Sequence, residues 1–116
     1  MALPQRRTPH TQQDWRALYR IENPAEVEAY VAEHPSVMAI LAQAPDEIRA
    51  VFGNEGPLRL SLEWSPEDGD CWLFVGIPSA NVGPSVLPLI DQFDERWWLD
   101  RATTTDATVV IDVVPL

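Results

Sequence analysis

The sequence predicts an α+β domain made of three short N-terminal helices, a β-hairpin, a long helix and a final strand. Two patterns predict this class. Apolar residues recur three and four positions apart in residues 24–52 and again in 86–98, which is the spacing of one buried helix face. They alternate with polar residues in 58–64, and after a turn-rich stretch a second apolar run covers 71–77, as in a β-hairpin. This order of elements predicts a small, mainly antiparallel sheet of three strands.

The length of the chain and its cysteine content limit what it can be. Its 116 residues correspond to one domain, which we place at residues 23–116. Residues 1–22 are predicted to form an N-terminal arm that is either flexible or docked. The single cysteine, Cys71, excludes an intramolecular disulfide. The chain shows neither a signal-peptide pattern nor a long apolar run, so we expect a cytoplasmic protein with no membrane partner.

Prolines divide the N-terminal half into the three predicted helices. The first helix begins with Asn23 as its N-cap and Pro24 at its first position. The residue before a proline is pushed out of the helical region, so we expect one break at Pro35 and another at Pro45. The third helix ends at Gly53, a residue type that is typical just past a helix. The positions expected to be buried are Val27, Tyr30, Val31, Val37, Met38, Ile40, Leu41, Ile48, Val51 and Phe52.

The two hairpin strands differ in character. The first strand has one apolar face, formed by Leu58, Leu60, Leu62 and Trp64. The second strand is apolar on both faces, with Cys71, Leu73, Val75 and Ile77 on one and Trp72 and Phe74 on the other. Such a strand is either central and covered twice, or its aromatic face meets a partner.

The last helix and the last strand complete the predicted sheet. The helix begins near Pro84 to Ser85, because Pro88 is tolerated only in a first turn. The final strand, residues 108–114, can join either edge of the hairpin. We favour the place beside the first strand, which makes an antiparallel sheet. The alternative is a parallel place beside the second strand, reached by a right-handed crossover.

The charge of the chain is strongly acidic. Eight arginines and no lysine face eighteen acidic residues, for a net charge of −10. Residues 1–20 carry +3, whereas residues 21–116 carry −13. A body this acidic repels nucleic-acid phosphate, so we do not expect it to bind DNA or RNA. It favours association with a basic protein.

Two adjacent tryptophans stand near the end of the long helix. Trp97 completes the apolar stripe, and Trp98, rotated by ~100°, cannot face the same core. Trp98 therefore packs sideways, anchors an interface with an acidic rim, or stacks on a ligand. On the interface interpretation, the predicted partner-binding residues are Trp98, Asp94, Asp91, Glu95, Trp72 and Phe74.

The sequence offers little that points to an enzyme. Asp91, Asp94 and Glu95 share a helix face and could bind a divalent cation, but a solvated face explains them as well. The chain contains no Gly-rich phosphate loop, no HExxH and no GxSxG. We therefore predict no catalytic residue, no metal site and no cofactor.

Three segments together resemble a family of small uncharacterised bacterial proteins. They are VEAYVAEHPSVMAIL at 27–41 with the PDEIRAVFG that follows, LIDQFDERWWLD at 89–100, and the closing IDVV strand. The resemblance covers residues 24–114, and FDERWWLD is its most specific part. It implies that the body is one unit and the N-terminal tail an extension. Because no activity is assigned to this family, it implies no catalytic residue.

These observations predict a non-enzymatic, acidic protein-binding module, such as an antitoxin, an immunity protein or an inhibitor of a basic protein. The alternatives are a homo-oligomeric structural protein, whose thin sheet pairs with a second copy, and a divalent-metal-dependent enzyme. Self-association is compatible with the first prediction as well.

Overall fold

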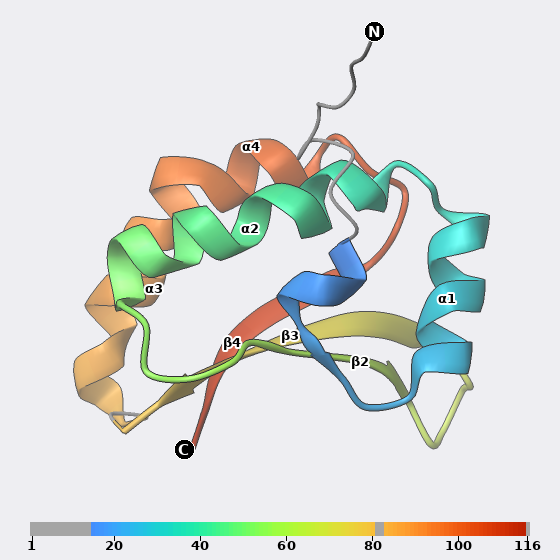
Figure 1. The fold of residues 1–116 in the computed structure, drawn as a ribbon, viewed down its shortest axis with the longest axis horizontal. Helices are drawn as coiled ribbons and strands as arrows, with labels where there is room; N and C mark the ends of the chain where they lie inside the picture. The colour runs from blue at the N-terminus through green and yellow to red at the C-terminus, as the bar shows by residue number, and fades with distance from the viewer. Residues whose placement is uncertain (1–14, 81–82, 116) are drawn as a thin grey trace, which may run out of the picture.

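The protein has two layers, with its helices on one side of a four-stranded sheet (Figure 1). The computed structural model describes residues 15–80 and 83–115. The described chain starts with a 3₁₀ turn, η3 (Trp15–Leu18), and a short strand, β1 (Arg20–Ile21). Two helices and the hairpin follow: α1 (Pro24–Glu33), α2 (Val37–Phe52), β2 (Arg59–Trp64) and β3 (Cys71–Ser79). A C-terminal helix then leads to β4 (Val109–Pro115).

The class α+β is right, but the predicted three-stranded, mainly antiparallel sheet is wrong. The sheet has the order β1-β2-β3-β4 and is mixed: β1 is parallel to β2, β2 is antiparallel to β3, and β3 is parallel to β4. The last strand thus takes the crossover place beside the second hairpin strand, which we did not favour. The reason lies in the predicted arm, because Arg20 and Ile21 pair with Arg59 and Leu60 and occupy the free edge of β2.

The side chain of Asn23 extends the short parallel pairing of β1 with β2. Asn23 donates from its Nδ2 to the carbonyl of Leu62 at 2.9 Å, and its Oδ1 accepts the N–H of Leu62 at 3.0 Å. The amide thereby satisfies both backbone groups of Leu62, as a further strand residue would. Asn23 is the N-cap residue of α1, as predicted, but its side chain makes no capping hydrogen bond to the start of this helix.

The prediction of three N-terminal helices is also wrong, because α2 runs through Pro45 without a break. A proline inside a helix lacks the N–H that would bind the carbonyl four residues earlier, here that of Leu41. The buried hydroxyl of Tyr19 donates to this carbonyl at 2.7 Å. A side chain from the predicted arm therefore satisfies the group that Pro45 leaves open.

The C-terminal helix changes its pitch at the tryptophan pair. It follows the 3₁₀ turn η4 (Pro84–Val86) and consists of α3 (Leu87–Phe93), a π-helical segment η5 (Asp94–Trp98) and α4 (Leu99–Ala102). The N–H of Leu99 donates to the carbonyl of Asp94, five residues earlier, which defines the wider turn. In Figure 1 this helix runs beside α2 above the sheet.

The core lies between the helices and one face of the sheet. Val27, Val37, Leu41, Ile48, Leu60 and Leu73 are among its least exposed residues. Two residues expected in the core are exposed instead: Met38 keeps 44% of its surface accessible and Trp64 keeps 48%. Trp15 and Tyr19, by contrast, are buried in the core. They anchor the beginning of the described chain under the helices.

Candidate functional site

The six predicted partner-binding residues lie on two separate surfaces. Trp72 and Phe74 belong to β3 and alternate with the core residues Leu73 and Val75, so they lie on the sheet face away from the helices. The other four, Asp91, Asp94, Glu95 and Trp98, belong to the C-terminal helix in the other layer. One flat partner surface cannot contact both groups.

The first surface is the sheet face that no described helix covers, here called the bare sheet face. The strand register places its side chains in rows: Glu63 beside Trp72, Ser61 beside Phe74 and Val110, and Arg59 beside Gly76 and Asp112. A hollow of about 460 Å³ is lined by Glu63, Trp72, Phe74 and Val110. Its centre is therefore apolar and aromatic, and its rim is charged.

The ring of Phe74 lies over Gly76 on the bare sheet face. A Cβ atom placed on Gly76 would lie 3.2 Å from the Phe74 ring and 3.3 Å from Val114. Phe74 thus leans along its own strand over the glycine, and the side chain of Val114 on β4 approaches the same glycine. Apolar side chains from both strands therefore cover Gly76.

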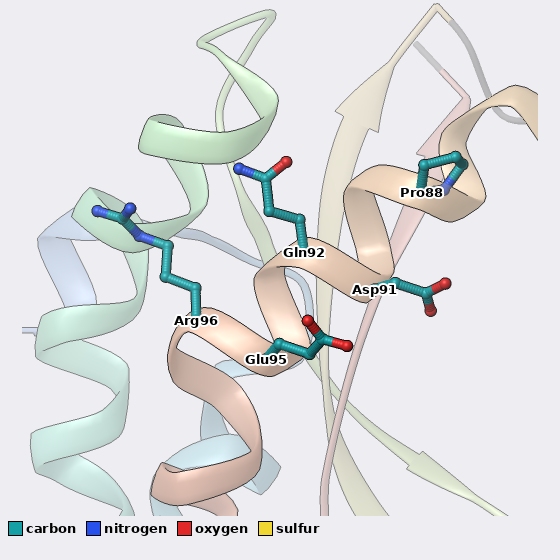
Figure 2. A pocket seen from close by; sticks show the side chains of 5 residues that line it. All are labelled: Pro88, Asp91, Gln92, Glu95 and Arg96. Carbon is teal, nitrogen blue, oxygen red and sulfur yellow. The ribbon is translucent and has the colours of Figure 1, made fainter.

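The second surface is a shallow pocket on the C-terminal helix, here called the acidic helix pocket (Figure 2). It has a volume of about 510 Å³ and is lined by Pro88, Asp91, Gln92, Glu95 and Arg96. Asp91 and Glu95, one turn apart, point outward on the same side in Figure 2. Arg96 reaches toward α2, where its Nε lies 3.2 Å from Oε1 of Glu47. No ion pair joins Asp91 or Glu95 to another described residue.

Asp94 is adjacent to this pocket but does not line it. Partial burial raises the pKa of the Asp94 carboxyl above its ordinary value, and the negative charge of Asp91 raises it further. Asp91 and Asp94 therefore repel each other, and the ionised form of Asp94 is disfavoured by its surroundings.

The π-helical segment determines how the two tryptophans sit. Trp97 is buried with 7% of its surface exposed, whereas Trp98 is half-buried and packs against the edge of the same core. Their ring centroids are 6.0 Å apart with an interplanar angle of 30°. The wider turn rotates successive residues by less than the α-helical ~100°, which helps both rings to reach one core. Trp98 is thus at least partly a packing residue.

A polar cluster that the sequence analysis missed joins the α1–α2 junction to the segment before β4. The Nδ1 of His34 lies 3.1 Å from Oδ2 of Asp106, and the hydroxyl of Ser36 donates to Oδ1 of Asp106 at 3.2 Å. Both contacts lower the pKa of Asp106, that of His34 most. The sequence signal was present in HPS at 34–36, but its acidic partner is 70 residues away.

The side chains of this Ser, His and Asp cluster are not arranged for nucleophilic catalysis. In a catalytic triad the imidazole lies between the hydroxyl and the carboxylate, so that it can take the proton of the hydroxyl. Here the carboxylate of Asp106 lies between Ser36 and His34. Ser36 also contacts the hydroxyl of Thr105 at 2.7 Å. The geometry indicates a structural clasp.

The carboxylates do not gather into a metal site. Within residues 15–80 and 83–115, no group of three or more His, Cys, Asp or Glu side chains has the arrangement needed to hold a metal ion. Asp91, Asp94 and Glu95 are included in this result. In the same part of the chain, no helix combines the length and the apolar character needed to cross a bilayer.

The comparisons with known proteins identify no relative. No protein-family model matches the chain, and neither a similar curated protein nor a similar solved structure was found.

Proposed function

We propose that this chain is a non-enzymatic module that binds a basic protein through its acidic helix pocket, as an antitoxin, an immunity protein or an inhibitor does. The observation that carries the proposal is the position of Asp91 and Glu95. Both carboxylates project from one side of the helix into a shallow depression, and no described residue pairs with either.

The pairing of Arg96 strengthens this argument. Arg96 lines the same pocket and is the residue next to Glu95, yet its guanidinium contacts Glu47 on α2. Arg96 is therefore not paired with the two outer carboxylates, and an incoming arginine or lysine can contact them. A carboxylate pair spaced by one helical turn can accept a guanidinium in a charge-assisted contact.

The charge of the whole layer supports the same partner chemistry. The described helices carry nine acidic residues and three arginines. A surface with this excess of one sign attracts an oppositely charged protein over distances of about a Debye length and speeds its association. This long-range electrostatic attraction adds to the local contacts that Asp91 and Glu95 would make with the partner.

The test compares two double variants that remove the same charge from different places. Asp91→Asn with Glu95→Gln removes both negative charges of the acidic helix pocket, and Glu67→Gln with Asp70→Asn removes two of the three negative charges of the β2–β3 turn. Each is used as tagged bait in a nuclease-treated lysate of the source cells, and bound proteins are eluted with rising salt. We expect one basic protein to be retained by the native chain and the turn variant and to be lost from the pocket variant.

Two outcomes contradict the proposal. Equal loss from both variants means that only the net charge matters, and recovery of the bait alone means that no such partner exists. Trp98→Ala is unsuitable as the test variant, because Trp98 packs against the core and its removal disturbs the fold.

A further inference from the structure

The bare sheet face has no role in the proposed function. It lies on the opposite side of the sheet from α2 and the C-terminal helix (Figure 1), so a partner seated on the acidic helix pocket leaves it open. Trp72, Phe74 and Val110 form an aromatic and apolar centre there, next to the edge strand β4. Val110 keeps 40% of its surface exposed. Apolar faces of this kind mark interaction sites.

We propose that the bare sheet face is the interface of a homodimer, in which two copies pack their sheets face to face. The occupant is a second copy because of the distribution of charge. In a chain with a net charge of −10, another copy is repelled by the acidic helix layer. The bare sheet face is nearly balanced instead: Arg20 and Arg59 compensate most of the charge of Glu22, Glu63 and Asp112.

The same charges make the face self-complementary. Arg59 and Glu63 lie on one face of β2, four residues apart, at opposite ends of a row of polar side chains. A two-fold axis through the middle of the face allows Arg59 of one copy to meet Glu63 of the other, and the reverse contact follows by symmetry. The aromatic centre, Trp72 and Phe74, then packs against its own equivalent.

The edge of the sheet is a poorer place for a second copy. β4 is an edge strand, but the N–H of Val113 donates to Oδ1 of Asp112 at 2.8 Å. The side chain of Asp112 thus accepts from the N–H of Val113, a donor that an added strand would need. Its carboxylate also places a negative charge beside the edge. Both are devices by which natural sheets prevent edge-to-edge pairing. The two copies are therefore expected to stack their faces.

The area of the face predicts how strong the dimer is. Four strands spaced by ~4.8 Å, with a mean length of about six residues, give a flat footprint of roughly 400 Å². Stable dimers bury about 800 Å² per copy, so this contact is small. We therefore expect a weak, reversible dimer that is populated only at high protein concentration.

The experiment is sedimentation equilibrium of the full chain from about 1 μM to 1 mM, with matched variants on the two faces. Val110→Glu and Val110→Arg place charges of either sign on the bare sheet face. Leu99→Glu and Leu99→Arg do the same on α4, where Leu99 is 58% exposed. We expect both Val110 variants to raise the dissociation constant at least tenfold and both Leu99 variants to leave it within about twofold.

A second measurement does not depend on any substitution. Amide NMR spectra of the native chain over the same dilution series map the residues whose environment changes on association. The proposal requires the changes to centre on residues 59–63, 72–76 and 110–112. A native chain that is monomeric at every concentration overturns it. So does a dimer that the Val110 variants leave intact, or dilution shifts that centre on the helices.

Discussion

The hydroxyl of Tyr19 donates to the carbonyl of Leu41 at 2.7 Å, and this carbonyl is the one that Pro45 leaves without its helical partner. The bond joins the segment before β1 to the middle of α2. Burial raises the pKa of the Tyr19 hydroxyl well above its ordinary value, so the hydroxyl is a neutral donor at neutral pH. The long helix α2 therefore depends on a residue that precedes the whole helical layer.

Tyr19→Phe removes this donor and leaves a buried carbonyl unsatisfied. We expect it to lower the free energy of unfolding by about 1–3 kcal/mol, as measured by urea denaturation. The matched background is Pro45→Ala, which restores an N–H four residues after Leu41. In that background the cost of Tyr19→Phe should fall clearly below its cost in the native chain. Equal costs in the two backgrounds would show that Pro45 and Tyr19 are not coupled through this carbonyl.

Asn23 is a second side chain that takes the place of a backbone hydrogen-bond partner, and its contribution can be tested by substitution. Asn23→Ala removes both hydrogen bonds to Leu62, and we expect a loss of about 1–3 kcal/mol, measured in the same way. Asn23→Asp keeps only an acceptor, so it retains the bond from the N–H of Leu62 but places a carboxylate beside its carbonyl. If the side chain of Asn23 acted by capping α1 instead, Asp and Ser would replace it with little loss, and that result would contradict its pairing with Leu62.

The clasp between His34 and Asp106 predicts a loss of stability in acid. The pKa of Asp106 is lower in the folded protein than its ordinary value, so its contribution to stability is complete above the ordinary value of ~3.9. It is lost as the pH falls through the lowered folded pKa. Asp106→Asn should therefore be less stable than the native chain near neutral pH, and the difference should shrink below pH ~3. A constant difference across this range would argue against the clasp.

Asp94 predicts a dependence of the opposite sign. Its pKa is raised in the folded state, so its contribution is complete below its ordinary pKa and is lost as the pH rises through the folded pKa. Asp94→Asn should consequently be more stable than the native chain at pH 7, by less than about 1 kcal/mol because the group is only partly buried and solvent screens its charge. The gain should vanish near pH 3. Asp91→Asn should produce part of the same gain by removing the repulsion.

The two tryptophans are expected to differ in their contribution to stability. Trp97 is almost completely buried, so Trp97→Ala should cost about 3–5 kcal/mol. Trp98 is half-buried, and its replacement by Ala should cost roughly half as much, since less apolar area leaves the water on folding. Thermal unfolding followed by circular dichroism measures both. Equal costs would mean that Trp98 is as central to the core as Trp97.

Much of the local structure was predictable from the sequence. The period-two pattern of residues 58–64 and the two-sided apolar run at 71–77 gave the hairpin, because alternation depends only on which face of a strand is buried. The break at Pro35 was predictable for a similar reason, since the restriction before a proline is local. The placement of Trp72 and Phe74 on one face also followed directly from the alternation.

The tertiary structure decided everything that needed a distant partner. Pro45 predicts a helix break until Tyr19 supplies a donor. The side chain of Asn23 would be expected to cap α1, but it binds the backbone of Leu62 instead. Arg20 and Ile21 are too short a strand to recognise alone, yet they occupy the free edge of β2 and direct β4 to β3. The six candidate site residues were separated into two surfaces in the same way, because a sheet has two faces and the helices cover one of them.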